Sequence, residues 1–188
     1  MKKLPACERE FDFALILSGV PDLTSNVEDA LFKAGCDDAT PSLRAGKPYL
    51  IFSRKALSLK DAILSAIQNV WAANIDADVA RVDNCYLVTQ ADIARRWGRS
   101  RQMVHQYQTG TRGPGGYPPP ACDLGDGSSP LWHWCEVAHW LWENDLIKED
   151  ILRDAQDVAI INNFLDLRRQ RRMDPALTKE VERVLGKR

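Results

Sequence analysis

The side chains best suited to specific chemistry in this 188-residue chain are the arginines and glutamines between Leu87 and Tyr117. An arginine can pair with O6 and N7 of guanine, and a glutamine can pair with N6 and N7 of adenine. The segment holds five arginines against one aspartate, whereas acidic residues outnumber basic ones on either side of it. Because phosphate binding needs a local excess of positive charge rather than a basic chain, the segment predicts DNA as the partner.

Two short helices joined by a sharp turn are expected to position these side chains. Thr89 is a good N-cap for the first helix, and Gly98 can adopt the left-handed conformation that ends it. Ser100 can then cap a second helix that runs through Tyr107. The residues expected to pack between the two helices are Ala94, Trp97 and Val104. The residues then left facing outward on the second helix are Arg99, Arg101, Gln102, His105 and Gln106.

The region 87–144 resembles the winged helix-turn-helix domains of the MerR and phage excisionase type. The resemblance is carried by VTQADIARRWGRSRQMVHQY, GTRGPGGYPPP and SPLWHWCEVAHWLWE. It implies that the glycine-bearing loop is the wing, that Leu131 and Trp132 form a strand, and that residues 136–144 form a helix that closes the core. It also implies that residues 100–108 enter the major groove and that residues 112–117 lie against phosphates or the minor groove. The candidate DNA-binding residues are Arg95, Arg96, Arg99, Ser100, Arg101, Gln102, His105, Gln106, Arg112, Gly113 and Tyr117.

Residues 1–84 show a different pattern, which predicts a ferredoxin-like (split βαβ) domain. Apolar residues alternate over 11–18, and two capping patterns, Ser25 with Glu28 and Ser58 with Asp61, each start a helix. The expected order is strand, helix, strand, strand, helix, strand, with the later strands near 39–44, 49–52 and 79–82. This domain offers no catalytic constellation, and Asp37-Asp38 is interpreted as an exposed acidic pair. We therefore expect a domain for protein association or effector sensing.

Several classes of protein are disfavoured by the composition. No segment reaches the roughly 18 consecutive apolar residues of a membrane span, so a cytoplasmic protein is expected. The five cysteines form no CxxC pair, which argues against a disulfide framework and a zinc ribbon. Neither a metal, nor a cofactor, nor an enzymatic activity is predicted. The potential metal ligands Cys122, His133, Cys135 and His139 lack a zinc-finger spacing, and the tryptophans at 132, 134, 140 and 142 are expected to pack in a core rather than to stack on bases.

Residues 147–188 are expected to form a helical tail after a winged domain of residues 85–146. A helix over about 148–172 carries one apolar stripe, Ile151, Ala155, Val158, Asn162 and Leu165. This stripe needs cover, and a second copy of the chain is favoured over the first domain because most regulators with such a reader bind two-fold sites. Arg168, Arg169, Arg171 and Arg172 favour the helix dipole, and a direct phosphate contact is the alternative. A short helix over 176–185 follows.

Taken together, the sequence predicts an α+β chain that acts as a sequence-specific DNA-binding transcriptional regulator, a repressor or autoregulator on two half-sites. Two alternatives remain open. One is an excisionase-like architectural protein that bends DNA, and the other is an antitoxin that also binds a protein partner.

Overall fold

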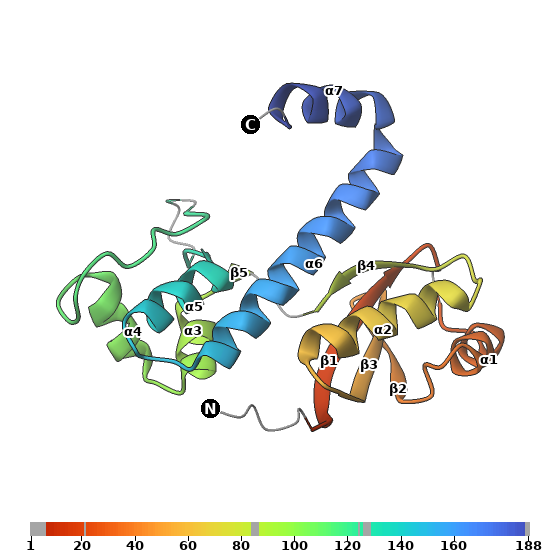
Figure 1. The fold of residues 1–188 in the computed structure, drawn as a ribbon, viewed down its shortest axis with the longest axis horizontal. Coiled ribbons are helices and arrows are strands. Elements are labelled where there is room, and N and C mark those ends of the chain that lie inside the picture. Colours follow the sequence, from red (N-terminus) through yellow and green to blue (C-terminus); the bar gives the residue numbers. More distant parts are fainter. Residues whose placement is uncertain (1–6, 21, 84–86, 124, 126–128, 187–188) are drawn as a thin grey trace. The chain divides into compact units, whose positions relative to one another are not determined.

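A computed structural model of the chain describes residues 7–20, 22–83, 87–123, 125 and 129–186 (Figure 1). The predicted α+β class is confirmed, since helices occur together with two small antiparallel sheets. The chain divides into two compact units. Unit 1 comprises residues 1–84 and 160–188, and unit 2 comprises residues 85–159. The boundary at Ile160 falls inside one long helix, whose two ends therefore belong to different units.

Unit 1 is built on a four-stranded antiparallel sheet with the strand order β2-β3-β1-β4. Its elements follow the chain in the order expected from the sequence. They are β1 (Arg9–Ser18), α1 (Ser25–Lys33), β2 (Ala39–Arg44), β3 (Lys47–Ala56), α2 (Leu59–Ala72) and β4 (Asp78–Val82). The tight turn between β2 and β3 is made by Ala45 and Gly46, which both have positive φ angles and so match the twist of a hairpin.

The core of unit 1 lies between this sheet and α2, which crosses one sheet face in Figure 1. Alternation along β3 turns Leu50 and Phe52 inward. The Phe52 ring stacks on Phe13 of β1, with 5.1 Å between the ring centroids. The buried residues that α2 contributes are Leu59, Ala62, Ile63, Ala66, Ile67 and Val70.

One charged side chain, Arg54, is also buried, two residues after Phe52 on the inward face of β3. Its Nε donates a 2.7 Å hydrogen bond to Asp38, and its Nη2 donates to Asp38 and to the carbonyl of Gly35. Its Nη1 donates to Ser65 on α2. The hydrogen bond with Asp38 raises the pKa of Arg54. The prediction of an exposed acidic pair is therefore wrong for Asp38, whose carboxylate compensates a buried guanidinium, whereas Asp37 is exposed.

The two predicted capping patterns of unit 1 have different outcomes. The Ser58 hydroxyl accepts a 3.1 Å hydrogen bond from the Asp61 backbone N–H, so the cap of α2 is confirmed. The prediction that Ser25 caps α1 is wrong. Thr24 is the N-cap residue, and its side chain makes no cap hydrogen bond. Placing the cap one residue late leaves the packing face of α1 unchanged, because Leu31 is still its buried residue.

Unit 2 contains a pair of short helices, a third helix that closes its core, and a small two-stranded sheet. Its elements are β5 (Leu87–Val88), α3 (Gln90–Trp97), α4 (Arg101–Gln108), β6 (Trp132–His133), α5 (Trp134–Glu143) and the first part of α6 (Glu149–Met173). β5 and β6 pair antiparallel, with Val88 opposite Trp132. The predicted strand is shifted by one residue, and Leu131 instead forms an isolated bridge with Cys122. The closing helix begins two residues earlier than expected, directly after β6.

Tryptophans form much of the core of unit 2, as expected for three of the four in the cluster. Trp132, Trp134 and Trp140 are buried, whereas Trp142 is 40% exposed, so the expectation of core packing is wrong for Trp142. The buried rings need partners for their indole N–H groups. Trp140 donates a 3.0 Å hydrogen bond to the Gly115 carbonyl, and Trp132 donates to Pro118. These bonds tie the loop after α4 to the core.

The apolar stripe predicted on the tail helix is covered by the chain itself. Ala155 belongs to the core of unit 2, and Asn162 and Leu165 are buried in unit 1. The Asn162 side chain accepts a 2.8 Å hydrogen bond from the Val82 N–H and donates to the Val82 carbonyl. It thereby satisfies the open edge of β4. The expectation that a second chain covers this stripe is wrong.

The arginines near the end of α6 pair with carboxylates. Arg168 lies over the Trp71 ring at 4.0 Å, and Arg168 and Arg172 both contact Asp78. Arg169 pairs with Asp166, and Arg171 pairs with Glu182. α7 (Pro175–Leu185) follows after Asp174, whose side chain accepts a hydrogen bond from the Leu177 N–H. The predicted short last helix is confirmed.

Within the described ranges, none of the helices combines the length and the apolar character that crossing a bilayer requires. Cys7, Cys36, Cys122 and Cys135 are free thiols, and Cys85 lies outside the described residues. Burial raises the pKa of the Cys36 thiol to about 11. Among the described residues, no three His, Cys, Asp or Glu side chains gather closely enough to hold a metal ion.

Candidate nucleic-acid interface

The start of α3 is fixed by a reciprocal cap. The Thr89 hydroxyl accepts a hydrogen bond from the Asp92 N–H, and the Asp92 carboxylate accepts one of 3.0 Å from the Thr89 N–H. The hydrogen bond from the Thr89 side chain to Asp92 holds the pKa of that carboxyl below its usual range. Two backbone donors of the first turn are thus satisfied inside the unit, as in a capping box. The predicted N-cap at Thr89 is confirmed.

A sharp turn then directs the chain into α4. Gly98 has φ 69° and ψ 35°, the left-handed conformation expected of it, and the Arg99 N–H donates to the Ala94 carbonyl. The Ser100 hydroxyl accepts a 3.2 Å hydrogen bond from the Met103 N–H and caps α4. Because the cap fixes the first turn, the side chains that follow Ser100 have a defined direction.

One side of α4 is locked into the core of unit 2. Val104 is fully buried, and Tyr107 packs edge-on against Trp97, with 5.2 Å between ring centroids. Tyr107 also meets Trp140 of α5 in a T-shaped contact. The predicted packing of Ala94, Trp97 and Val104 is confirmed by their burial. The opposite side of α4 therefore remains on the surface.

The exposed side of α4 brings together most of the predicted base readers. Arg101 and His105 are one helical turn apart, and Gln102 lies beside them. All three are exposed, as are Arg99 and Ser100 at the start of the helix, whereas Gln106 is half-buried at its edge. We call Arg99, Ser100, Arg101, Gln102 and His105 the reading face. The major groove of DNA admits an α-helix, and these side chains are the part of α4 that is free to enter it.

Other predicted site residues lie elsewhere. The Arg96 guanidinium lies 5.2 Å from the centroid of the Trp134 ring, and Arg95 pairs with Asp92. Tyr117 packs on Trp140 with 5.0 Å between ring centroids, and burial raises the pKa of its hydroxyl to about 12. These contacts place Arg96 and Tyr117 in the packing of unit 2, while Arg95 remains exposed on α3.

The loop after α4 is held against the core by its glycines. Gly113 has φ 82°, and a Cβ at this position would overlap the ring of Tyr107. The Gly115 carbonyl accepts the hydrogen bond of Trp140. Arg112 is exposed, and its guanidinium lies 5.8 Å from the centroid of the Tyr107 ring. Arg112 is thus an exposed positive charge on this loop, whereas Gly113 allows the close approach of loop and core.

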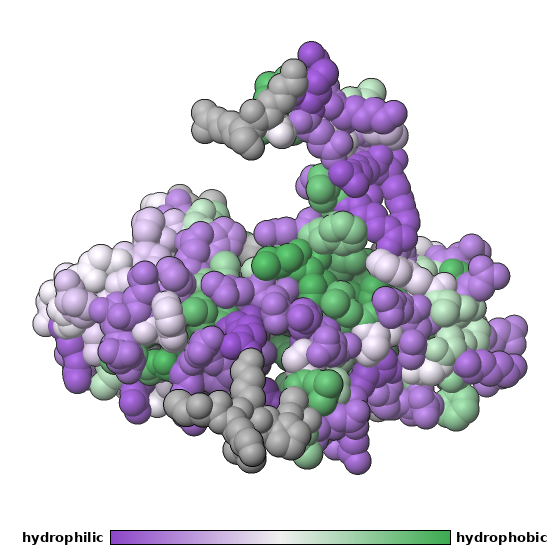
Figure 2. Space-filling model, in the orientation of Figure 1, coloured by the Kyte–Doolittle hydropathy of each residue, from purple (hydrophilic) through white to green (hydrophobic). Residues whose placement is uncertain are grey.

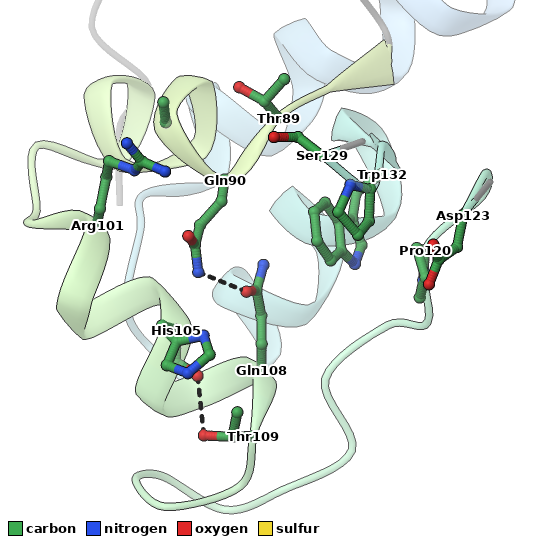
Figure 3. A pocket seen from close by; sticks show the side chains of 12 residues that line it. Thr89, Gln90, Arg101, His105, Gln108, Thr109, Pro120, Asp123, Ser129 and Trp132 are labelled. Carbon is green, nitrogen blue, oxygen red and sulfur yellow. Dashed lines mark hydrogen bonds between the residues drawn. The ribbon is translucent and has the colours of Figure 1, made fainter. Parts of the chain in front are cut away.

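A groove of about 550 Å³ runs beside the reading face and separates α4 from Pro120, Asp123, Ser129, Pro130 and Trp132 (Figure 3). On the α4 side it is lined by Arg101, His105 and Thr109, and on the other side by Asp123 and Trp132. Gln90 of α3 donates a 2.8 Å hydrogen bond to Gln108 at its base, as Figure 3 shows.

Thr109 is a lining residue that the sequence analysis did not single out. It is exposed at the C-cap of α4, four residues after His105 and eight after Arg101, so the helical spacing alone was a sufficient signal. By contrast, Asp123 carries no local pattern. Asp123 lines the groove because the preceding residue, Cys122, pairs with Leu131 in an isolated antiparallel bridge. This pairing joins residues nine positions apart.

Comparisons of the chain with protein-family models, with curated proteins and with solved structures give no match.

Proposed function

We propose that this chain binds double-stranded DNA in a sequence-specific manner and regulates transcription, with unit 2 as a winged helix-turn-helix domain. The observation that carries the proposal is the reading face of α4, whose opposite side is locked by Val104 and Tyr107. In such domains the start of the second helix contacts base edges. Arg101 and Gln102 are the leading base readers, because their side chains match guanine and adenine, respectively.

The order of elements in unit 2 supports this assignment. Two short helices with a left-handed glycine between them are followed by a long loop, a strand that pairs with β5, and a closing helix. Arg99 of the reading face, Arg95 of α3 and Arg112 of the following loop are exposed basic side chains and are proposed to contact phosphates. The backbone of the wing loop near Gly113 is proposed to approach DNA beside Arg112.

For unit 1 we propose a ferredoxin-like domain that serves association or effector sensing. The support is the element order of 1–84 together with the strand order β2-β3-β1-β4. The two buried polar side chains among its described residues both have structural partners, since Arg54 pairs with Asp38 and Asn162 bonds to the Val82 backbone. The regulator is proposed to act as a homodimer on two half-sites, in keeping with the symmetry of most such readers.

Fluorescence anisotropy with a labelled duplex of mixed sequence tests the electrostatic part of the proposal. The full chain should bind, and the logarithm of its affinity should fall linearly with the logarithm of the salt concentration. Replacing Arg112 by Ala removes one proposed phosphate contact, so the slope should decrease in magnitude by about 1. Lys60→Ala, which removes an equal charge from an exposed position of α2 in unit 1, should leave affinity and slope unchanged. A chain that binds no duplex at low salt would refute the proposal.

A further inference from the structure

The last two helices of the chain carry an apolar surface that nothing in the described chain covers. Three of the exposed apolar residues of α6, Ile160, Phe164 and Leu167, recur at four and three residues and so form one stripe, and Met173 is exposed at the end of the helix. Figure 2 shows a patch of apolar residues over the middle of α6. This stripe is distinct from the buried stripe that contains Asn162 and Leu165.

α7 carries a second such stripe. None of the residues Pro175–Leu185 is buried, and the apolar residues Leu177, Val181 and Val184 recur at four and three residues. A helix with one apolar face gains most of its stability by packing that face against something. Among the residues that the structure describes, none packs on α7 in a way that buries this face.

An ion pair fixes α7 on the side of α6 that carries the exposed stripe. Arg171 follows Phe164 by seven residues and Leu167 by four, so it continues the same row. Its Nε donates a 3.0 Å hydrogen bond to Glu182 of α7. The two apolar stripes therefore lie on successive helices that this ion pair joins.

The chain cannot close this surface by folding α7 back onto its own α6. Asp174 is the single residue between the two helices, and it is already used as the N-cap of α7. An antiparallel helical hairpin needs a connection of about 2–5 residues. The two stripes are both apolar and thus suited to pack on each other, but they are unable to meet within one chain.

We infer that the occupant of this surface is a second copy of the chain, with α7 of each copy packed on the Ile160–Phe164–Leu167 stripe of the other. A two-fold arrangement uses both stripes twice, as an isologous interface requires. The lengths agree, since the stripe from Ile160 to Leu167 on α6 and the stripe from Leu177 to Val184 on α7 each cover seven residue steps. Each stripe therefore spans about 10 Å. The exchange places one α7 over each stripe and leaves no apolar stripe uncovered.

The exposed area is sufficient for such a dimer. The stripes and their neighbours comprise eight large apolar side chains, on average more than half exposed: Ile160, Phe164, Leu167, Met173, Leu177, Val181, Val184 and Leu185. Together they offer on the order of 500 Å² of apolar surface. A standard stable interface buries about 800 Å² per partner, and about three-fifths of that is apolar.

This inference deepens the proposed function, since a two-fold protein matches a two-fold DNA site, but its physical basis lies in unit 1 alone. Light scattering coupled to gel filtration, with the full chain and no DNA, separates the two claims. The wild-type chain should be a dimer at micromolar concentration. Val181→Lys and Phe164→Glu, both at exposed positions, should each give a folded monomer by circular dichroism. Lys179→Glu, on the opposite side of α7, should remain a dimer.

The double variant Phe164→Glu/Val181→Lys tests which stripes pair. If α7 of one copy packs on α6 of the other, the opposite charges attract and the dimer should be regained. If α7 packs on α7, the double variant carries like charges at its interface and stays monomeric, which would overturn the pairing. A monomeric wild-type chain, or dimers of both single variants, would overturn the inference as a whole. A dimer that binds no DNA would leave this inference intact and refute the proposed function.

Discussion

The ring of Tyr107 fills the space that a side chain on Gly113 would need. This relationship joins the buried side of α4 to the loop that follows it, because Tyr107 packs between Trp97 and Trp140. The position of the reading face therefore depends on a glycine that contacts no exposed base reader.

Gly113→Ala should destabilise unit 2, because the added methyl group must displace the Tyr107 ring. The cost should exceed that of Gly110→Ala by about 1–3 kcal/mol, the usual range for overpacking. Gly110 is the matched control, since it also has a positive φ of 70° but has open space where its Cβ would lie. Urea unfolding followed by tryptophan fluorescence measures the difference, since five of the six tryptophans belong to unit 2. Equal losses for the two variants would contradict the Tyr107 contact.

Asn162→Ala should lower the free energy of unfolding of unit 1 by about 1–3 kcal/mol, because the buried Val82 N–H loses its partner. Asn163→Ala, one residue further along α6 and exposed, should change it little. Denaturation followed by far-ultraviolet circular dichroism compares the two. If Asn163→Ala proves as costly as Asn162→Ala, Asn162 does not cap the edge of β4.

Asp38→Asn should destabilise unit 1 because it leaves the Arg54 guanidinium without its carboxylate. Removing one partner of a fully buried pair costs about 3–5 kcal/mol, and the loss here should be smaller, since the Asp38 side chain is 28% exposed. Asp37→Asn, at the exposed neighbour, is the control and should be close to neutral. Thermal unfolding compares the stability of the two variants. An equal loss for both would mean that local negative charge, and not the Asp38–Arg54 pair, stabilises unit 1.

Tyr117 should make unit 2 sensitive to alkali. Burial raises the pKa of its hydroxyl from 10 to about 12, so between these values the unfolded chain has lost a proton that the folded chain retains. The contribution of the buried Tyr117 hydroxyl to the stability of unit 2 is fully present below pH 10 and is lost as the pH rises through about 12. Tyr117→Phe should weaken this dependence in denaturant unfolding at graded pH while leaving DNA affinity at neutral pH unchanged. A large loss of DNA binding would instead place the Tyr117 hydroxyl at the interface.

Local patterns in the sequence predicted most elements of this structure. The caps at Thr89 and Ser100 and the left-handed Gly98 each act within three or four residues, so the local order of residues is enough to predict them. The α+β class and the order of elements in residues 1–84 follow from the same kind of signal. The apolar period of α6 was also visible, but not which part of the chain covers it, because that depends on Val82, which lies eighty residues away.

The candidate site was predicted less completely than the elements. Arg96 and Tyr117 resemble binding residues by type, yet each packs on a tryptophan that lies more than twenty residues later in the chain. The pairing of Asp38 is not visible in a local pattern for the same reason, since its partner Arg54 lies on β3, sixteen residues later. Helical spacing does settle the side of α4 that faces outward, and for this reason Arg101, Gln102 and His105 were found together.

Selection of bound duplexes from a randomised DNA pool tests the central claim most directly. The wild-type chain should enrich one sequence motif, and Arg101→Ala should lose discrimination at one base pair of it, at a cost of about 1–3 kcal/mol, if Arg101 reads a guanine. Arg183→Ala, at an exposed position of α7 in unit 1, should enrich the same motif as the wild type. If the wild type enriches no motif, or if Arg101→Ala enriches the full wild-type motif, the reading face is not where this chain recognises DNA.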